Sequence, residues 1–268
     1  SNNNGCGIAR SQEAKDLGIK MGEPFYQKKE FMNEHYFCVY SSNYNLYGDM
    51  SDRVMSVIKK YADQVEVYSI DECFCDFTSV PDDELLDTLM MIKEEVKKQV
   101  GIPVSIGVGP NKTLAKLTSH IAKKNKDYNG ICSYWELKNF RNSLYGIDID
   151  EVWGIGRAWA KKLKFIGVES IGQFLMMPDI QVRKMMNVNG LRTKMELLGM
   201  YCHLVKTNSK QKKNIASTRS FGSDVDSFEQ VAEAMYNYIQ TGIKKLRDNE
   251  IMPNRATIFL SLIHISEP

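Results

Sequence analysis

The sequence is poor in the features that mark membrane, zinc-binding and disulfide-linked proteins. No stretch approaches the run of about 18 uninterrupted apolar residues that a membrane-spanning helix needs, so we expect no membrane contact. The 268 residues include only four histidines, and none of the six cysteines forms a C-x-x-C pair, which argues against a zinc site. Scattered cysteines of this kind are typical of reduced thiols, and we expect a cytoplasmic protein.

The formal net charge is only +2, but the charge is unevenly distributed. Residues 151–220 carry 13 basic and 4 acidic side chains, a net charge of +9, whereas residues 1–80 carry a net charge of −4. A basic block in a nearly neutral chain is a candidate surface for a polyanion such as nucleic acid. The alternative is a solvated lysine-rich linker, because residues 206–213 contribute four of these charges.

Hydrophobic periodicity predicts an α+β fold in which helices cover one face of a sheet. Alternating or short apolar runs predict strands at 36–40, 65–70, 73–78, 102–108 and 130–134. Apolar residues at helical spacing predict helices at 8–20, 49–62 and 111–124, and another that begins at Pro81. After residue 150 the pattern changes to short helices separated by glycines, followed by strands at 217–221 and 255–260 with a helix between them.

Two adjacent carboxylates, Asp71 and Glu72, lie at the predicted turn between the strands at 65–70 and 73–78. Because a turn interrupts the up-and-down alternation of a strand, both side chains can reach one divalent cation. Mg²⁺ prefers one or two protein carboxylates, and two such ions stabilise the attacking and leaving oxygens of phosphoryl transfer. Acidic pairs are also common in turns that bind nothing, so the dipeptide alone leaves both interpretations open.

A group of lysines follows the predicted strand at 102–108. Its members are Lys112, Lys116, Lys123, Lys124 and Lys126. Lysines on a helix that follows a central strand can neutralise a triphosphate. A solvated helix face is the alternative interpretation.

The run VWGIGRAWAKKL, which begins at Val152, places a G-x-G turn before a basic helix. This pattern is typical of a helix-hairpin-helix, whose backbone N–H groups and helix N-terminus bind a phosphate without reading bases. No βαβ unit surrounds the glycines, so a dinucleotide-binding fold does not fit. We expect Trp153 and Trp159 to pack in the interior. The candidate DNA-binding residues are Gly154, Gly156, Arg157, Lys161 and Lys162.

Six runs resemble Y-family translesion DNA polymerases in their order and spacing, and they are most similar to the UmuC-like members. The runs are SNNNGCGIARSQEAKDLGIKMG, YSSNYNLYGDMSDRVM, VYSIDECFCDFT, SIGVGPNKTLAKLTSHIAKKN, VWGIGRAWAKKL and TRSFG. The resemblance implies a right-hand polymerase whose palm has a ferredoxin-like sheet with helices on one face. It also implies a helix-hairpin-helix thumb and a partial α/β little finger. The implied boundaries are 1–30 for the fingers, 31–147 for the palm, 148–206 for the thumb, 207–213 for a linker and 214–260 for the little finger.

The same resemblance implies a function and its site residues. The function is error-prone, Mg²⁺-dependent nucleotidyl transfer on damaged template in the SOS response, with two Mg²⁺ ions as cofactors. Asp71 and Glu72 match the paired palm carboxylates, and Lys123 matches a lysine that contacts the triphosphate. Lys15 stands where many relatives have a phosphate-contacting arginine, whereas Gln12 departs from their tyrosine. The implied partners are primer–template DNA, an incoming dNTP, a UmuD-type dimer, a recombinase filament and a sliding clamp.

The two ends of the chain depart from the family pattern. The family's first palm strand bears another metal-binding aspartate and is followed by a Phe-Tyr pair, and this chain starts after both. The chain also stops midway through the little finger, so we expect it to be inactive by itself. Residues 261–268 can be encoded by a sequence that resembles a transposon-based sequencing adapter, and we expect them to be non-native.

Two other functions remain open at this stage. One is a different two-metal enzyme on a palm-like sheet, such as a nucleotide cyclase, although a cyclase needs no basic duplex-binding thumb. The other is a DNA-binding module without catalysis, which the acidic turn at Asp71 and Glu72 disfavours.

Overall fold

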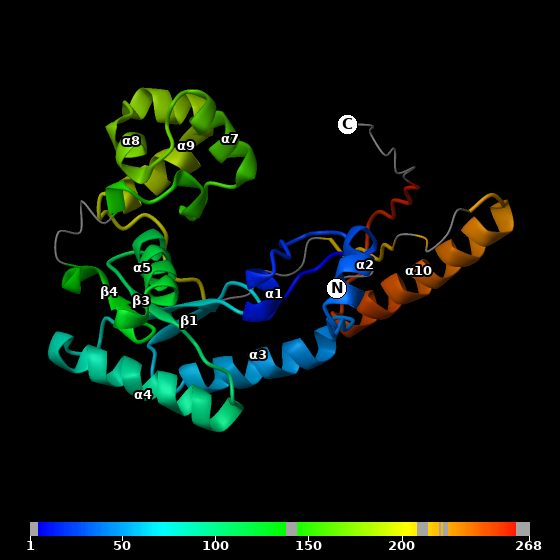
Figure 1. Cartoon of the computed structure of the whole chain (residues 1–268), viewed down its shortest axis with the longest axis horizontal. Helices are drawn as coiled ribbons and strands as arrows, with labels where there is room; N and C mark the ends of the chain where they lie inside the picture. The colour runs from blue at the N-terminus through cyan, green and yellow to red at the C-terminus, as the bar shows by residue number, and fades with distance from the viewer. Residues whose placement is uncertain (1–4, 138–143, 208–213, 220, 222–224, 261–268) are drawn as a thin grey trace. The chain divides into compact units, whose positions relative to one another are not determined.

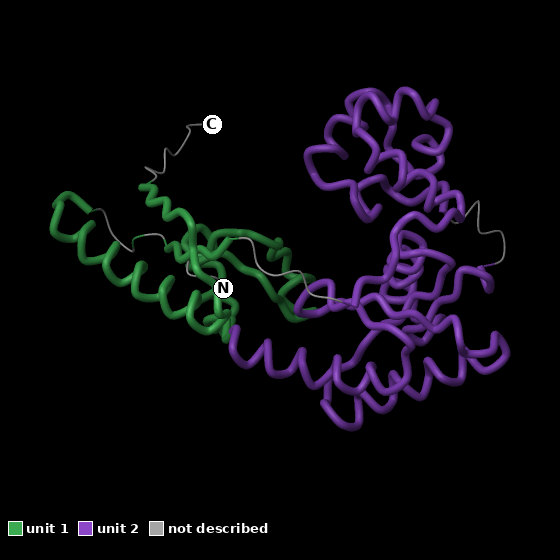
Figure 2. The backbone as a smooth tube through the Cα atoms, turned by 180° about the vertical axis from the view of Figure 1, so that it is seen from behind, with its two compact units in different colours: residues 1–43, 210–268 green, residues 44–209 purple. Residues whose placement is uncertain are grey.

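The computed structural model describes residues 5–137, 144–207, 214–219, 221 and 225–260. It divides the chain into two compact units, unit 1 (residues 1–43 and 210–268) and unit 2 (residues 44–209), which Figure 2 shows in different colours. None of the helices within the described ranges is long and apolar enough to cross a membrane. The residues 261–268 that the sequence marked as non-native lie outside the described residues.

Unit 1 contains three helices among its described residues: α1 (Gln12–Asp16), α2 (Phe25–Glu34) and α10 (Phe228–Asp248). The predicted helix at 8–20 is shorter than expected at both ends, because Ser11 caps its start by accepting a hydrogen bond from the Ala14 N–H and Gly18 follows its end with a left-handed φ of +89°. Ser227 caps α10 by accepting a hydrogen bond from the Gln230 N–H at 3.3 Å. No residue of α10 is fully buried, and Val231, Met235, Ile243 and Leu246 of its apolar stripe are half-buried, so the described residues cover the stripe only in part.

Three predicted strands of unit 1 are wrong. The residues at 36–40 form no ladder, and Tyr36 and Tyr40 are exposed rather than buried. The described residues of 217–221 and 255–260 likewise form no strand. Apolar alternation makes a strand only where a second strand accepts its hydrogen bonds, and the described part of unit 1 supplies none. The region predicted as an α/β little finger therefore contains a helix and no strand in its described residues.

Unit 2 holds the strands and the remaining helices, and its α+β character confirms the predicted fold class (Figure 1). Its elements are α3 (Tyr44–Ile58), β1 (Gln64–Val67), β2 (Cys73–Asp76), α4 (Asp82–Val100), β3 (Ile106–Val108), α5 (Lys112–Lys124), β4 (Ile131–Ser133), α7 (Arg157–Phe165), α8 (Ile171–Met176) and α9 (Asp179–Leu197), with short 3-10 helices at Lys126–Tyr128, Tyr134–Glu136 and Ile149–Glu151. The helix predicted from Pro81 ends at Gly101, which has a left-handed φ of +82°.

The strands form two separate pairs in the described residues rather than the single predicted sheet. β1 and β2 are antiparallel, and β3 and β4 are parallel. Ile106 and Val108 pack toward the core of α3 and α4, whereas Gly107 faces α5. A Cβ on Gly107 would lie 2.1 Å from backbone atoms of α5, so this close approach requires glycine. Helices therefore lie on both faces of β3–β4, which differs from the predicted arrangement on one face.

One apolar core joins α5 to the helices that follow residue 150. Leu114 and Leu117 of α5 belong to the same buried cluster as Leu163, Ile171 and Phe174 from α7 and α8. The expected palm and thumb segments thus share a core inside unit 2. The domain boundaries that the sequence implies, including 147/148, stay predictions.

Candidate functional site

The turn between β1 and β2 presents Asp71 and Glu72 side by side. The register pair nearest the turn joins Val67, the last residue of β1, to Cys73, the first residue of β2. The turn therefore spans residues 68–72. The backbone N–H groups of Tyr68 and Ser69 both donate to the Glu72 carbonyl oxygen at 3.0 Å, which closes the turn. Both carboxylates are exposed, so a ligand can approach either one from solvent.

Ser69 sets the conformation of the first carboxylate in this turn. Its Oγ donates a hydrogen bond to Asp71 Oδ1 at 2.7 Å. The hydroxyl thus restrains the Asp71 side chain through Oδ1 and leaves Oδ2 outside this bond. A carboxylate held in this way keeps acceptor capacity for a cation.

Helix α5 places two lysines against the acidic residues of the hairpin. Lys116 Nζ lies 2.6 Å from Glu72 Oε2, and Lys112 forms an ion pair with Glu66. The same ammonium groups lie over aromatic rings, Lys116 over Tyr68 at 5.3 Å and Lys112 over Phe74 at 5.1 Å. The hairpin and α5 are therefore joined by charge as well as by packing.

Glu66, the partner of Lys112, is partly buried. Burial alone would raise its pKa, but hydrogen bonds from Lys112 and from the Lys206 backbone N–H outweigh that effect and hold the pKa below its ordinary range. Lys206 N donates to Glu66 Oε2 at 2.6 Å. The carboxylate therefore ties the residues after α9 to β1.

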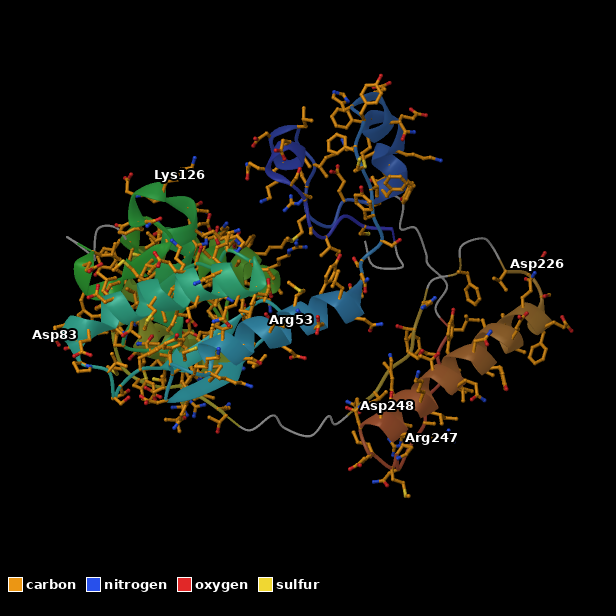
Figure 3. The ribbon with its side chains drawn as sticks, turned by 90° about the horizontal axis from the view of Figure 1, so that it is seen from below. Arg53, Asp83, Lys126, Asp226, Arg247 and Asp248 are labelled. Atoms are coloured by element: carbon orange, nitrogen blue, oxygen red, sulfur yellow. The ribbon has the colours of Figure 1, made fainter. Side chains whose placement is uncertain are left out.

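The two predicted triphosphate lysines lie in different units. Lys123 is exposed in the last turn of α5, seven residues after Lys116, so it lies on nearly the same helix face and roughly 10 Å further along the axis. Within the described part of the chain, Asp71 bonds to Ser69 and Glu72 to Lys116, and neither pairs with Lys123. Lys15 is exposed on α1 in unit 1. Figure 3 marks Lys126, which begins the short 3-10 helix after α5.

A buried carboxylate, Glu196, anchors the end of α9 on the first turn of α5. Glu196 is fully buried, and its Oε2 accepts hydrogen bonds from the Thr113 N–H at 3.1 Å and from Thr113 Oγ1 at 2.6 Å. Its Oε1 accepts from the N–H groups of Cys202 and His203 at 3.2 and 2.8 Å. A negative charge is favourable at a helix N-terminus, so this residue holds α5 in register with α9.

Sequence reasoning missed two residues of this region. The lysine pattern places Lys116 with the other lysines of its helix and contains no signal that pairs it with Glu72. Glu196 was not selected at all. The available signal was its charge, because it is one of only four acidic residues in the basic block at 151–220.

Trp153 is half-buried and packs against the hairpin, so it is less interior than the sequence predicts. Its ring centroid lies 5.3 Å from that of Phe74, 5.8 Å from that of Tyr68 and 5.6 Å from that of His203. Aromatic pairs at these distances and tilts are favourable beyond the area that they bury. The turn before α7 is thereby attached to the strand that follows Glu72.

The G-x-G turn begins α7 as the sequence predicted. Gly154 has a left-handed φ of +90°, and a Cβ there would lie 3.0 Å from Thr193 Oγ1. Gly156 is the N-cap of α7 and offers no side-chain cap. An uncapped helix N-terminus is suited to an anion, because its first N–H groups lack intrahelical acceptors.

The cations of α7 divide into exposed and paired groups. Arg157, Lys161 and Lys162 are exposed. The ammonium group of Lys164 is not free to bind an anion, because it forms ion pairs with Asp148 and Asp150, both at 2.9 Å. The surface formed by Gly154, Gly156, Arg157, Lys161 and Lys162 is called the α7 surface below.

The donor set at the hairpin fits part of a magnesium site. Asp71 and Glu72 offer hard oxygen donors from adjacent positions, and Mg²⁺ commonly takes one or two carboxylates and keeps several water ligands. Among the described residues, no group of three histidine, cysteine, aspartate or glutamate side chains could hold a metal ion. The two carboxylates therefore account for a partial coordination sphere.

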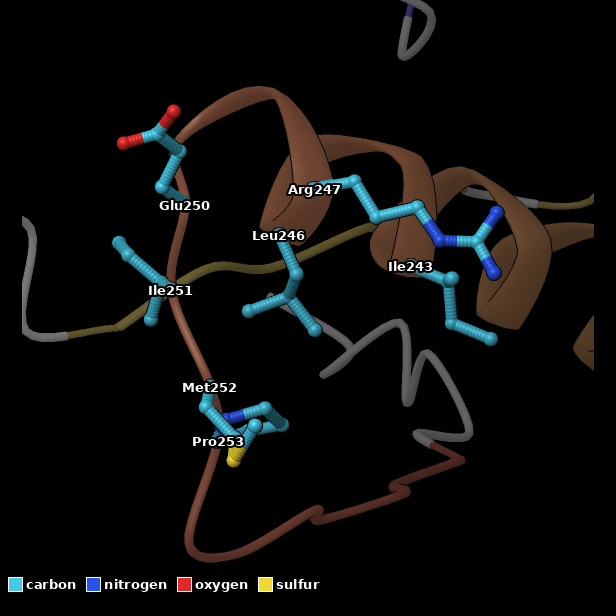
Figure 4. A pocket seen from close by; sticks show the side chains of 7 residues that line it. All are labelled: Ile243, Leu246, Arg247, Glu250, Ile251, Met252 and Pro253. Atoms are coloured by element: carbon cyan, nitrogen blue, oxygen red, sulfur yellow. The ribbon is translucent and has the colours of Figure 1, made fainter.

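An apolar groove of about 390 Å³ lies at the end of α10 in unit 1 (Figure 4). Ile243 and Leu246 line it from the helix, and residues 251–253 line it from the segment that follows. It contains none of the predicted site residues, so it is separate from the hairpin and from the α7 surface.

Comparisons with known proteins agree with this fold. Residues 1–120 match the model of the impB/mucB/samB family. The chain is 39% identical to UmuC of Salmonella typhimurium over 249 residues, which are 92% of this chain and 59% of UmuC. It is 34% identical to SamB of Salmonella typhimurium, covering 100% of this chain and 64% of SamB. The chain thus spans about three fifths of the length of these curated relatives.

Solved structures show the same fold. A Y-family DNA polymerase chimera of Dbh and Dpo4 superposes with a TM-score of 0.75 at 24% identity, covering 91% of this chain and 69% of the chimera. DinB from Sulfolobus solfataricus gives a TM-score of 0.60 at 26% identity, covering 87% of this chain and 67% of that one. The chain is thus similar to the impB/mucB/samB family over residues 1–120 and to UmuC and SamB over most of its length, and its fold is that of the Y-family DNA polymerases.

Proposed function

We propose that the protein is an error-prone translesion DNA polymerase that acts in the response to DNA damage. The observation that carries this proposal is the acidic turn: Asp71 and Glu72 lie exposed and adjacent, with Lys116 at 2.6 Å from Glu72 and Lys123 two helical turns further along the same face of α5. Anionic and cationic groups in this order suit a metal ion and the polyphosphate of a nucleotide.

Asp71 and Glu72 are the proposed ligands of two Mg²⁺ ions. Y-family polymerases generally use divalent metals, which when bound supply charge stabilisation to the attacking and leaving oxygens of nucleotidyl transfer. The protein contributes two carboxylates, held at the end of a rigid hairpin. Ser69 fixes Asp71, and the turn bonds to the Glu72 carbonyl fix the backbone between them.

Lys123 and Lys15 are the proposed contacts to the triphosphate of the incoming dNTP. Lys123 is exposed on the last turn of α5 and forms no ion pair within the described residues, so its charge is available to a phosphate. Lys15 is proposed on the resemblance of its segment to the family's fingers. Both residues would orient the nucleotide rather than take part in bond making.

The α7 surface is the proposed contact to primer–template DNA. Its glycines leave the first N–H groups of α7 open, and its exposed Arg157, Lys161 and Lys162 add positive charge. Contacts of this kind bind phosphates and carry no sequence information. The packing of Trp153 on Phe74 would hold this surface at a fixed distance from the acidic turn. The UmuD-type dimer, the recombinase filament, the sliding clamp and the cytoplasmic location stay predictions.

Primer extension on damaged template tests the proposed activity. The complete gene product is given a primer that ends opposite an abasic site, with all four dNTPs and Mg²⁺. We expect extension past the lesion that a metal chelator abolishes and added Mg²⁺ restores. Duplex binding without extension would instead favour a non-catalytic DNA-binding protein, and extension that persists in chelator would contradict the metal assignment.

A further inference from the structure

Two thiols lie next to each other immediately after the acidic turn. Cys73 and Cys75 are on β2, and their Sγ atoms are 3.7 Å apart. Side chains two residues apart in a strand point to the same face, so this proximity follows from the strand itself. Phe74 points to the opposite face, where it contacts Trp153 and Tyr68. The thiol pair therefore lies on the face of the hairpin that the aromatic cluster does not cover.

The thiol face is open enough for a small oxidant. Val65 and Val67 of β1 are the register partners of Cys75 and Cys73. Val67 is 51% exposed, and neither cysteine is fully buried. In contrast, Cys132 on β4 is completely buried, and burial raises its pKa to about 11. A molecule the size of hydrogen peroxide can thus reach the pair but not Cys132.

We propose that Cys73 and Cys75 form an oxidant-sensitive dithiol that a peroxide converts to a disulfide. One thiol attacks the peroxide O–O bond and becomes a sulfenic acid with release of water. The second thiol then displaces the hydroxyl from that sulfur, forming the S–S bond and releasing a second water. The two sulfurs are oxidised, and one hydrogen peroxide is reduced to two waters. A thiol reductant reverses the reaction through a mixed disulfide.

The disulfide would distort the strand beside Glu72. Strand residues i and i+2 have Cα atoms about 6.6 Å apart, which is near the upper end of the range of about 4.4–6.8 Å that disulfides span and above their most common value of about 5.5–6 Å. The Sγ atoms must also approach from 3.7 Å to a bond length of about 2.05 Å. Closing the bond with the preferred disulfide geometry therefore shortens the Cα–Cα span and bends β2 at its first residues. Because Cys73 follows Glu72 directly, bending displaces the carboxylate that holds the metal under the proposed function.

Peptide mapping tests the dithiol without reference to polymerase activity. The 268-residue chain is exposed to hydrogen peroxide, free thiols are alkylated, and the peptide that contains residues 71–76 is weighed before and after reduction. We expect this peptide to lose two hydrogens and to resist alkylation until it is reduced. Cys38 is the matched control, because it is exposed and no second cysteine lies near it in the sequence. Cys132 is the control for a buried cysteine. Alkylation of both Cys73 and Cys75 under conditions that oxidise Cys38 would overturn the proposal.

The consequence for catalysis rests on the proposed function and is tested with the complete gene product. We expect peroxide to lower primer extension at least tenfold, a reductant to restore it, and Cys75→Ser to remove the sensitivity. Disulfide formation with unchanged extension would overturn the link to Glu72. Disulfide formation in a protein that extends no primer even when reduced would overturn the proposed function and leave the dithiol standing.

Discussion

Glu196 and Thr113 are 83 positions apart in sequence, yet the buried Glu196 carboxylate accepts hydrogen bonds from both the backbone N–H and the Oγ1 of Thr113. The same carboxylate accepts two N–H groups from the chain after α9. α5 also carries Lys116, the partner of Glu72. The position of the proposed metal ligand is thus connected, through one helix, to the end of α9.

The first prediction concerns Glu196→Ala. Removing the carboxylate leaves the buried donors of Thr113 and the partly buried N–H groups of Cys202 and His203 without acceptors, and a buried donor without an acceptor costs about 1–3 kcal/mol. We expect the free energy of unfolding, measured by urea denaturation, to fall by about 3 kcal/mol. The control is Glu169→Ala at an exposed position, which should change stability by less than about 0.5 kcal/mol. Equal effects of the two substitutions would contradict the anchoring role.

The second prediction concerns Lys116→Met. In the metal-free hairpin the Lys116 ammonium group competes with a divalent cation for Glu72. Removing a partly exposed ion pair of about 1 kcal/mol should tighten Mg²⁺ binding roughly fivefold. Calorimetric titration with Mg²⁺ measures the change, and Lys126→Met is the control because Lys126 lies beyond the end of α5 (Figure 3). Weaker Mg²⁺ binding by Lys116→Met would contradict the competition.

The third prediction concerns the α7 surface. Each lysine–phosphate contact contributes about −0.9 to the slope of log K against log salt concentration. Lys161→Ala combined with Lys162→Ala should therefore flatten the slope by about 1.8 for all duplex sequences alike. Lys164→Ala is a matched control on the same helix, because Asp148 and Asp150 already neutralise Lys164. A large slope change for the control, or a loss that depends on sequence, would contradict the proposed surface.

The fourth prediction concerns pH. The pKa of Glu66 is lowered in the folded protein, so its ionised form stabilises the fold above the ordinary glutamate value of about 4.3. That contribution is lost as the pH falls through the lowered value. Glu66→Gln should flatten the decline in unfolding free energy on the acid side of about pH 4.3 and leave the slope near pH 8 unchanged. A variant with the same acid decline as the parent protein would show that Glu66 contributes nothing to it.

Sequence patterns predicted the elements that depend on residues close together in the chain. The alternation on both sides of Asp71 and Glu72 predicted the hairpin, and the G-x-G run predicted the start of α7. The contacts between Lys116 and Glu72 and between Glu196 and Thr113 could not be predicted, because they depend on how distant helices pack. The strands expected at 36–40 and 255–260 do not form. Their apolar residues satisfy the pattern, but the described chain offers them no pairing strand.

Substitution of Glu72 tests the central claim most directly. The complete gene product with Glu72→Gln is compared with the parent protein in primer extension and in duplex binding, and Asp83→Asn at the start of α4 is the matched control carboxylate (Figure 3). We predict that Glu72→Gln lowers the extension rate on the order of a thousandfold, because several kcal/mol of transition-state stabilisation are lost, while duplex binding and the Asp83→Asn control stay near the parent values. Near-normal extension by Glu72→Gln would contradict the assignment of the acidic turn as the catalytic centre.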